Sequence, residues 1–135
     1  MDQKNEVEQV GGWHYGVFHI KPWDEIARLK LNWFQGEALK YLCRNSLKGG
    51  LMDINKAISI AEKAKLEEIS RPIELSYNYG QKYNPDFLEF YAEKVYGETE
   101  ELSSTFIAAT TCILLCKWDN LIINLLKIRK LYYGE

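Results

Sequence analysis

The sequence contains few cysteines, and they form no pattern that predicts disulfide bonds or a metal site. There are three, Cys43, Cys112 and Cys116, in surroundings too apolar for a disulfide framework. Cys112 and Cys116 lie four residues apart on a predicted helix and have no histidine nearby, unlike the ligand sets of zinc sites. We therefore expect the thiols to pack in the core of a protein in the reducing cytoplasm.

Long hydrophobic runs are also missing. The most apolar window, residues 106–116, is about half as long as a membrane-spanning helix must be. The first ten residues are polar and lack the apolar region of a signal peptide. These absences predict no membrane association, and residues 1–12 are expected to form a flexible polar tail.

Positive charge is not in excess. The sequence has 17 lysines and arginines and 19 aspartates and glutamates, so the formal net charge is −2. A general nucleic-acid binder needs a basic surface that displaces counterions from phosphates. The total charge excludes that class of partner, but it leaves room for a local basic pocket.

Common signatures of catalysis are absent as well. The sequence has no phosphate loop, no glycine-rich dinucleotide motif, no HExxH and no GxSxG. His14 and His19 are the only histidines, and no nucleophile motif accompanies them. The residues alone predict no catalytic group, no metal and no cofactor.

The sequence does contain helical periodicity over most of its length. Helices are predicted over residues 22–30, 33–44, 51–69, from the Asn84-Pro85 cap to Gly97, and over residues 101–132. Residues 13–20 are aromatic and β-branched, and with Leu75, Tyr77 and Tyr79 they suit either two short strands or an ordered aromatic loop. We predict a mainly all-α single domain over residues 13–135, with the connector after residue 69 dividing it into two halves.

The second and third predicted helices should form a helical hairpin. The predicted inward residues are Phe34, Ala38, Tyr41 and Leu42 on the first of these helices, and Ile54, Ala57, Ile58, Ala61 and Ala64 on the second. The small side chains of the second set allow the two helices to approach closely across a short turn at Gly49-Gly50.

A heptad pattern marks the C-terminal region and predicts one long helix, with Asp119-Asn120 as the place where it could bend. Its members are Ile107, Thr111, Leu114, Trp118, Leu121, Leu125, Ile128 and Tyr132. Further apolar residues lie outside this seam, so the helix is apolar on more than one face. Either the domain's own helices cover both faces, or a second copy does. The prediction is a homo-oligomer, most simply a dimer, with Trp118 as anchor and Leu114, Leu121, Leu125 and Ile128 beside it.

The segment from Arg44 to Gly50 suits an anion, because Lys48 and Arg44 flank a glycine turn at a predicted helix start. Asp53 offers an ordinary alternative, since a carboxylate there also complements the helix dipole. Glu37 is explained either as a solvated partner of Lys40 or as a polar wall beside a ligand. The aromatic residues Trp13, Tyr15, Tyr77 and Tyr79 suit either base stacking or core packing.

A series of short motifs resembles the SaV-like domain of small phage proteins. It runs from His14-Tyr15 through GEALKYLCR at residues 36–44 and Lys48-Gly49 to DINKA at residues 53–57. The match covers about residues 14–68, and a related segment forms the C-terminal part of a phage nucleotide kinase that has no phosphate loop. Glu37 departs from the asparagine usual in that family.

The resemblance implies a site for a nucleotide or another anionic ligand. The residues it brings forward, with the glycine turn added, are His14, Tyr15, Lys40, Tyr41, Arg44, Lys48, Gly49, Gly50 and Lys56. The expected function is that of a phage accessory protein that binds a nucleotide or nucleotide-derived signal in the host cytoplasm, with a kinase-like transferase as its enzymatic form. The alternative is an inhibitor that binds a host defence protein and needs no small ligand.

Overall fold

The computed structural model describes residues 21–75 and 82–135, and all regular structure within them is helical, so the predicted all-α fold is confirmed. The α-helices are α1 (Pro22–Arg28), α2 (Trp33–Arg44), α3 (Gly50–Leu66), α5 (Pro85–Glu89), α6 (Glu100–Leu115) and α7 (Trp118–Ile128). The π-helical turns η3 (Asn45–Gly49), η4 (Phe90–Val95) and η5 (Arg129–Tyr133) continue α2, α5 and α7. Most of the expected strand-or-loop element, residues 13–20 with Tyr77 and Tyr79, lies outside the described residues.

Local capping explains where several helices begin. Asn32 and Gln35 form a capping box at α2, in which each side chain accepts a hydrogen bond of 2.9 Å from the backbone nitrogen of the other. Asn84 caps α5 and is followed by Pro85 at the first helical position, as predicted. The Thr99 side chain caps α6. These capping interactions are local. They set where α2, α5 and α6 begin, and the helices then pack against segments that are distant in the sequence.

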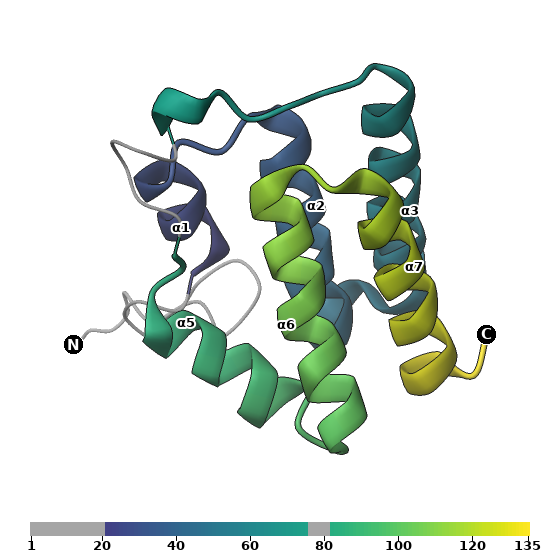
Figure 1. Ribbon diagram of the computed structural model, residues 1–135. Helices are drawn as coiled ribbons and strands as arrows, with labels where there is room; N and C mark the ends of the chain where they lie inside the picture. Colours follow the sequence, from purple (N-terminus) through teal and green to yellow (C-terminus); the bar gives the residue numbers. More distant parts are fainter. Residues whose placement is uncertain (1–20, 76–81) are drawn as a thin grey trace.

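Four helices surround the core. α2 lies along α3, α3 along α7, α7 along α6, and α6 against α2 (Figure 1). α1 packs on α2, while η4, which continues α5, packs on α6. The predicted hairpin of α2 and α3 is confirmed, and all five predicted inward residues of α3 are buried. On α2, Ala38 and Leu42 are buried, whereas Phe34 and Tyr41 are only partly covered.

The prediction of one long C-terminal helix is wrong. The chain reverses after α6, where Cys116 adopts a left-handed conformation with a φ of 56°, and α7 returns along α6 (Figure 1). The main buried stripes are Leu102, Phe106, Ala109 and Ile113 on α6, and Trp118, Leu121, Leu125 and Ile128 on α7. On α6 the seam residues Ile107 and Thr111 are exposed, so the buried face of α6 does not follow the seam that α7 buries.

The residues predicted for an oligomer interface lie in the protein's own core. Each of Leu114, Trp118, Leu121, Leu125 and Ile128 is at most 5% exposed, and the Trp118 indole donates a hydrogen bond of 2.8 Å to the Ile69 carbonyl. Because the chain reverses before α7, these side chains are covered by neighbouring helices of the same molecule. The domain's own helices thus cover this face, and these five residues do not offer a surface to a second copy.

The cysteines pack as expected. Cys43 is fully buried, and Cys112 and Cys116 lie partly buried against the core, all as free thiols. In residues 21–75 and 82–135 there is no group of three histidine, cysteine or acidic residues arranged to hold a metal ion. Within the same residues, no helix is both long and apolar enough to cross a membrane.

A chain of aromatic rings runs through the core from α5 to the C-terminus. Neighbouring ring centroids lie between 5.0 and 5.8 Å apart. In order of contact the rings are Tyr83, Phe87, Tyr91, Phe106, Tyr96, Tyr132 and Tyr133. Such offset and tilted pairs add to the stability that burial of apolar area supplies. They join α5, η4, α6 and η5 into one packed unit.

A polar cluster ends this aromatic chain. The Asn45 amide donates a hydrogen bond of 2.6 Å to the Tyr96 hydroxyl, which in turn donates one of 2.7 Å to the Leu42 carbonyl. The Tyr133 hydroxyl donates to the Asn45 backbone carbonyl at 3.1 Å. Burial raises the pKa of Tyr96 well above its usual value and that of Tyr133 to about 12, so both hydroxyls stay protonated at neutral pH.

Replacing Tyr96 by phenylalanine should lower the free energy of unfolding by about 1–3 kcal/mol, because a buried hydroxyl and its hydrogen bonds are lost. Urea unfolding followed by circular dichroism measures the difference. The control is Tyr132→Phe, because the Tyr132 hydroxyl makes no hydrogen bond to a described side chain or backbone group and its ring is partly exposed. That change should cost less than about 0.5 kcal/mol. Equal effects of the two changes would contradict a role for the polar cluster.

Candidate ligand groove

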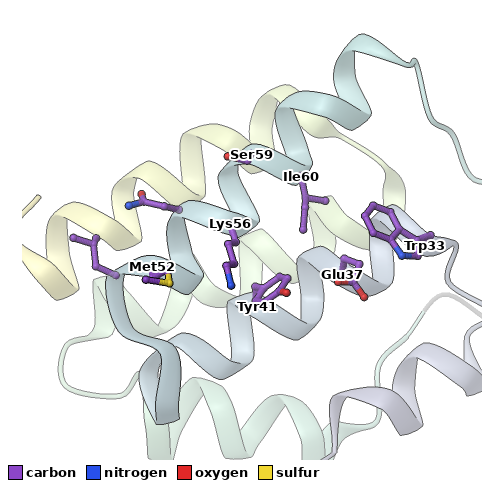
Figure 2. A pocket seen from close by; sticks show the side chains of 9 residues that line it. Trp33, Glu37, Tyr41, Met52, Lys56, Ser59 and Ile60 are labelled. Atoms are coloured by element: carbon purple, nitrogen blue, oxygen red, sulfur yellow. The ribbon is translucent and has the colours of Figure 1, made fainter.

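An open groove of about 690 Å³ lies between α2 and α3 (Figure 2). Its lining residues are Trp33, Glu37, Tyr41, Leu51, Met52, Asn55, Lys56, Ser59 and Ile60. Sites for small organic ligands commonly have volumes of roughly 300–1,000 Å³ and combine apolar walls with a few polar groups. The size and lining of the groove are therefore those of a ligand site.

The α2 wall of the groove is built from residues spaced one helical turn apart. Trp33, Glu37 and Tyr41 follow at intervals of four, so they share one face of α2 and form a row along the groove (Figure 2). The Trp33 side chain is 64% exposed. A large aromatic ring at one end of the groove is thus accessible from solvent, and a carboxylate separates it from a second ring.

Three cations gather around the Tyr41 ring. The Lys40 ammonium lies 4.6 Å from the ring centroid, the Lys56 ammonium 5.3 Å and the Arg44 guanidinium carbon 5.8 Å. Lys40 and Arg44 come from α2 itself, whereas Lys56 extends from α3 toward the ring (Figure 2). Cation–π attraction holds each of them near the aromatic ring. Four residues predicted from the sequence, Lys40, Tyr41, Arg44 and Lys56, therefore meet at one place.

Two of these cations already have carboxylate partners. The Lys40 ammonium lies 3.1 Å from the nearer Glu37 oxygen, and the Arg44 Nε lies 2.9 Å from the Asp53 Oδ2. Lys56 makes no ion pair with the carboxylates that the structure describes. Three positive and two negative groups leave one positive charge in excess beside Tyr41. That excess, close to Lys56, favours an anion in the groove.

At the glycine turn the structure agrees with the ordinary alternative, in which the Asp53 carboxylate lies at the start of α3. Gly50 has a φ of 60°, a conformation that glycine adopts readily, which accounts for the glycine at this position. Gly49 lies directly against the Asp53 carboxylate, because a Cβ at position 49 would overlap that group. Lys48 is exposed on the turn. An anion at the turn would have to lie beside a carboxylate, so the structure favours the Tyr41 end of the groove instead.

Several features of the site were not found from the sequence, and two predicted residues cannot be placed. His14 and Tyr15 lie outside the described residues. The sequence pattern placed Trp33 only at the start of a helix. Its spacing of four residues from Glu37, and of eight from Tyr41, is the signal that could have placed it on the same helix face. Met52, which is 67% exposed, was also missed.

No family model, no curated protein and no solved structure matches this chain. The resemblance of residues 14–68 to the SaV-like domain therefore stays an expectation drawn from the residues alone.

Replacing Gly49 by alanine should destabilise the protein by about 1–3 kcal/mol, because the added methyl group overlaps the Asp53 carboxylate. A double-mutant cycle with Asp53→Ala tests the cause. In the Asp53→Ala background the cost of Gly49→Ala should fall below about 1 kcal/mol, since the overlapping group is gone. Thermal and urea unfolding of the four proteins give the coupling. Additive costs would show that Gly49 and Asp53 do not restrain each other.

Proposed function

We propose that this protein binds a nucleotide or a nucleotide-derived signal in the groove between α2 and α3. The observation that supports the proposal most strongly is the cation cluster around Tyr41, in which Lys56 pairs with no carboxylate of residues 21–75 or 82–135. A phosphate group placed there would balance the excess charge. The exposed Trp33 ring at the other end supplies a platform on which a base can stack.

The role that suits this site is binding rather than catalysis. A protein that sequesters a nucleotide signal, or that serves nucleotide metabolism by carrying one, needs affinity and no reacting group. The resemblance of the motif series to small phage proteins supports the same setting, an accessory protein acting in the cytoplasm of an infected cell. Phosphoryl transfer would be the expected chemistry if the chain were an enzyme, as in the kinase whose C-terminal part it resembles.

A second candidate function is binding to a protein, such as a component of host defence. The observation in its favour is that Trp33 and Met52, both on the groove, are 64% and 67% exposed. Exposed aromatic and methionine side chains are common at protein interfaces. The two functions differ in what fills the groove, and calorimetry with nucleotides separates them.

Replacing Lys56 by alanine should weaken binding of a nucleotide by about 1.5–3 kcal/mol, because a charge-assisted contact to phosphate is lost. Lys56 is a cleaner test than Arg44, since removing Arg44 also leaves the buried Asp53 carboxylate without its ion pair. Isothermal titration calorimetry against nucleoside mono- and triphosphates, cyclic dinucleotides and ADP-ribose measures the affinities.

Lys94→Ala is the matched control, because Lys94 is exposed on η4 and does not line the groove. It should leave the affinity unchanged. If none of these nucleotides binds the unaltered protein, the nucleotide proposal fails and the protein-binding function is favoured.

Self-association is a separate part of the proposal. It would use exposed residues, because the five predicted from the sequence are buried in the core. The exposed apolar side chains of α6 and α7 are Ile107, Leu115, Ile123 and Leu126. If the protein forms a homo-oligomer, Ile123→Glu should shift it toward the monomer in light scattering at concentrations of about tens of micromolar, while Trp118→Phe should leave the stoichiometry unchanged. A protein that is monomeric throughout this range would contradict the homo-oligomer.

A further inference from the structure

Glu37 occupies the middle of the groove in a position that charge alone does not explain. It lies one turn after Trp33 and one turn before Tyr41, and it lines the same groove (Figure 2). A phosphate-binding surface ordinarily lacks carboxylates, because like charges repel. Here the carboxylate stands between an exposed aromatic ring and a cluster of cations. The two ends of the groove therefore suit two chemically different parts of one ligand.

The ion pair of Glu37 leaves part of its carboxylate unused. Its Oε1 lies 3.1 Å from the Lys40 ammonium, and the Glu37 side chain is 25% exposed. No described residue donates a hydrogen bond to its second oxygen, although an ionised carboxylate has about four lone-pair sites. A ligand in the groove can thus donate to Glu37 while the pair with Lys40 stays intact.

A carboxylate accepts hydrogen bonds and donates none, so it distinguishes among the edges of nucleobases. Guanine presents two adjacent donors, its N1–H and its 2-amino group, which match the two oxygens of a carboxylate. Adenine places an unprotonated N1 beside its amino group, and that acceptor would face the carboxylate unfavourably. Hypoxanthine keeps the N1–H and lacks the amino group, so it should rank between the two.

We infer that Glu37 is a specificity-determining residue that selects a guanine-type base through two adjacent N–H donors. The base stacks at the Trp33 end, and repulsion by Glu37 directs the phosphate to Lys56 and the other cations at Tyr41. This inference rests on the proposed nucleotide-binding function, and it names the class of nucleotide: a guanosine 5′-phosphate or a nucleotide signal that contains guanine.

The test compares guanosine, inosine and adenosine 5′-monophosphates by calorimetry on the full-length protein. We expect the affinity for the guanosine nucleotide to exceed that for the adenosine nucleotide by roughly 10–100-fold, with inosine between them, as for other bidentate base contacts. Glu37→Gln should abolish most of this preference. Glu37→Asp keeps the carboxylate and should retain part of it, provided that the circular dichroism spectrum is unchanged.

Glu89→Gln is the matched control, because Glu89 is an exposed carboxylate on α5 and does not line the groove. It should leave the ratio of affinities unaltered. If all three nucleotides bind the unaltered protein equally, the inference is overturned while the proposed function stands. A Glu37→Gln variant that weakens all three to the same extent also overturns it, because Glu37 would then act only by positioning Lys40. If no nucleotide binds, the proposed function and the inference both fail.

Discussion

The hydrogen bonds of Asn45 are the interaction on which the arrangement of the helices depends. Asn45 is only 2% exposed and lies where α2 passes into η3. Its amide donates to the Leu42 carbonyl and the Tyr96 hydroxyl, and it accepts hydrogen bonds from the Tyr133 hydroxyl. Three segments far apart in the sequence thus meet at one buried side chain. An apolar residue there would deprive the buried Tyr96 hydroxyl and the partly buried Tyr133 hydroxyl of a side-chain partner, each at a cost comparable to a lost hydrogen bond.

The geometry that Asn45 stabilises also produces the groove. The turn after α2 brings α3 back alongside it, so Lys56 reaches the ring of Tyr41, which is fifteen positions earlier in the chain. The buried Asp53 carboxylate holds Arg44 close to the same ring and lies against Gly49. A protein with a formal net charge of −2 therefore has a small positive region, because packing, rather than composition, decides which charges lie together.

The sequence predicted most of the fold because helix signals are local. The predicted bounds of α2 agree with the structure, and so do the cap at Asn84 and the buried face of α3. The long C-terminal helix was wrong for a reason that periodicity does not reveal. The heptad pattern continued in phase from Ile107 to Tyr132, yet no glycine or proline marks the reversal at Cys116, where a left-handed conformation is uncommon for a residue other than glycine.

By itself, the sequence determined the helical class, the α2–α3 hairpin and four of the residues that meet at the groove. The helical class and the hairpin depend on side-chain spacings within a few turns of each helix, whereas the four residues were brought forward by the resemblance of the motif series to the SaV-like domain. Two outcomes required the tertiary structure: α7 folds back to bury Trp118, and Arg44 of α2 pairs with Asp53 of α3. Those outcomes depend on contacts between segments distant in sequence, and the free energy of such contacts is set by burial and partner geometry, which no local pattern contains.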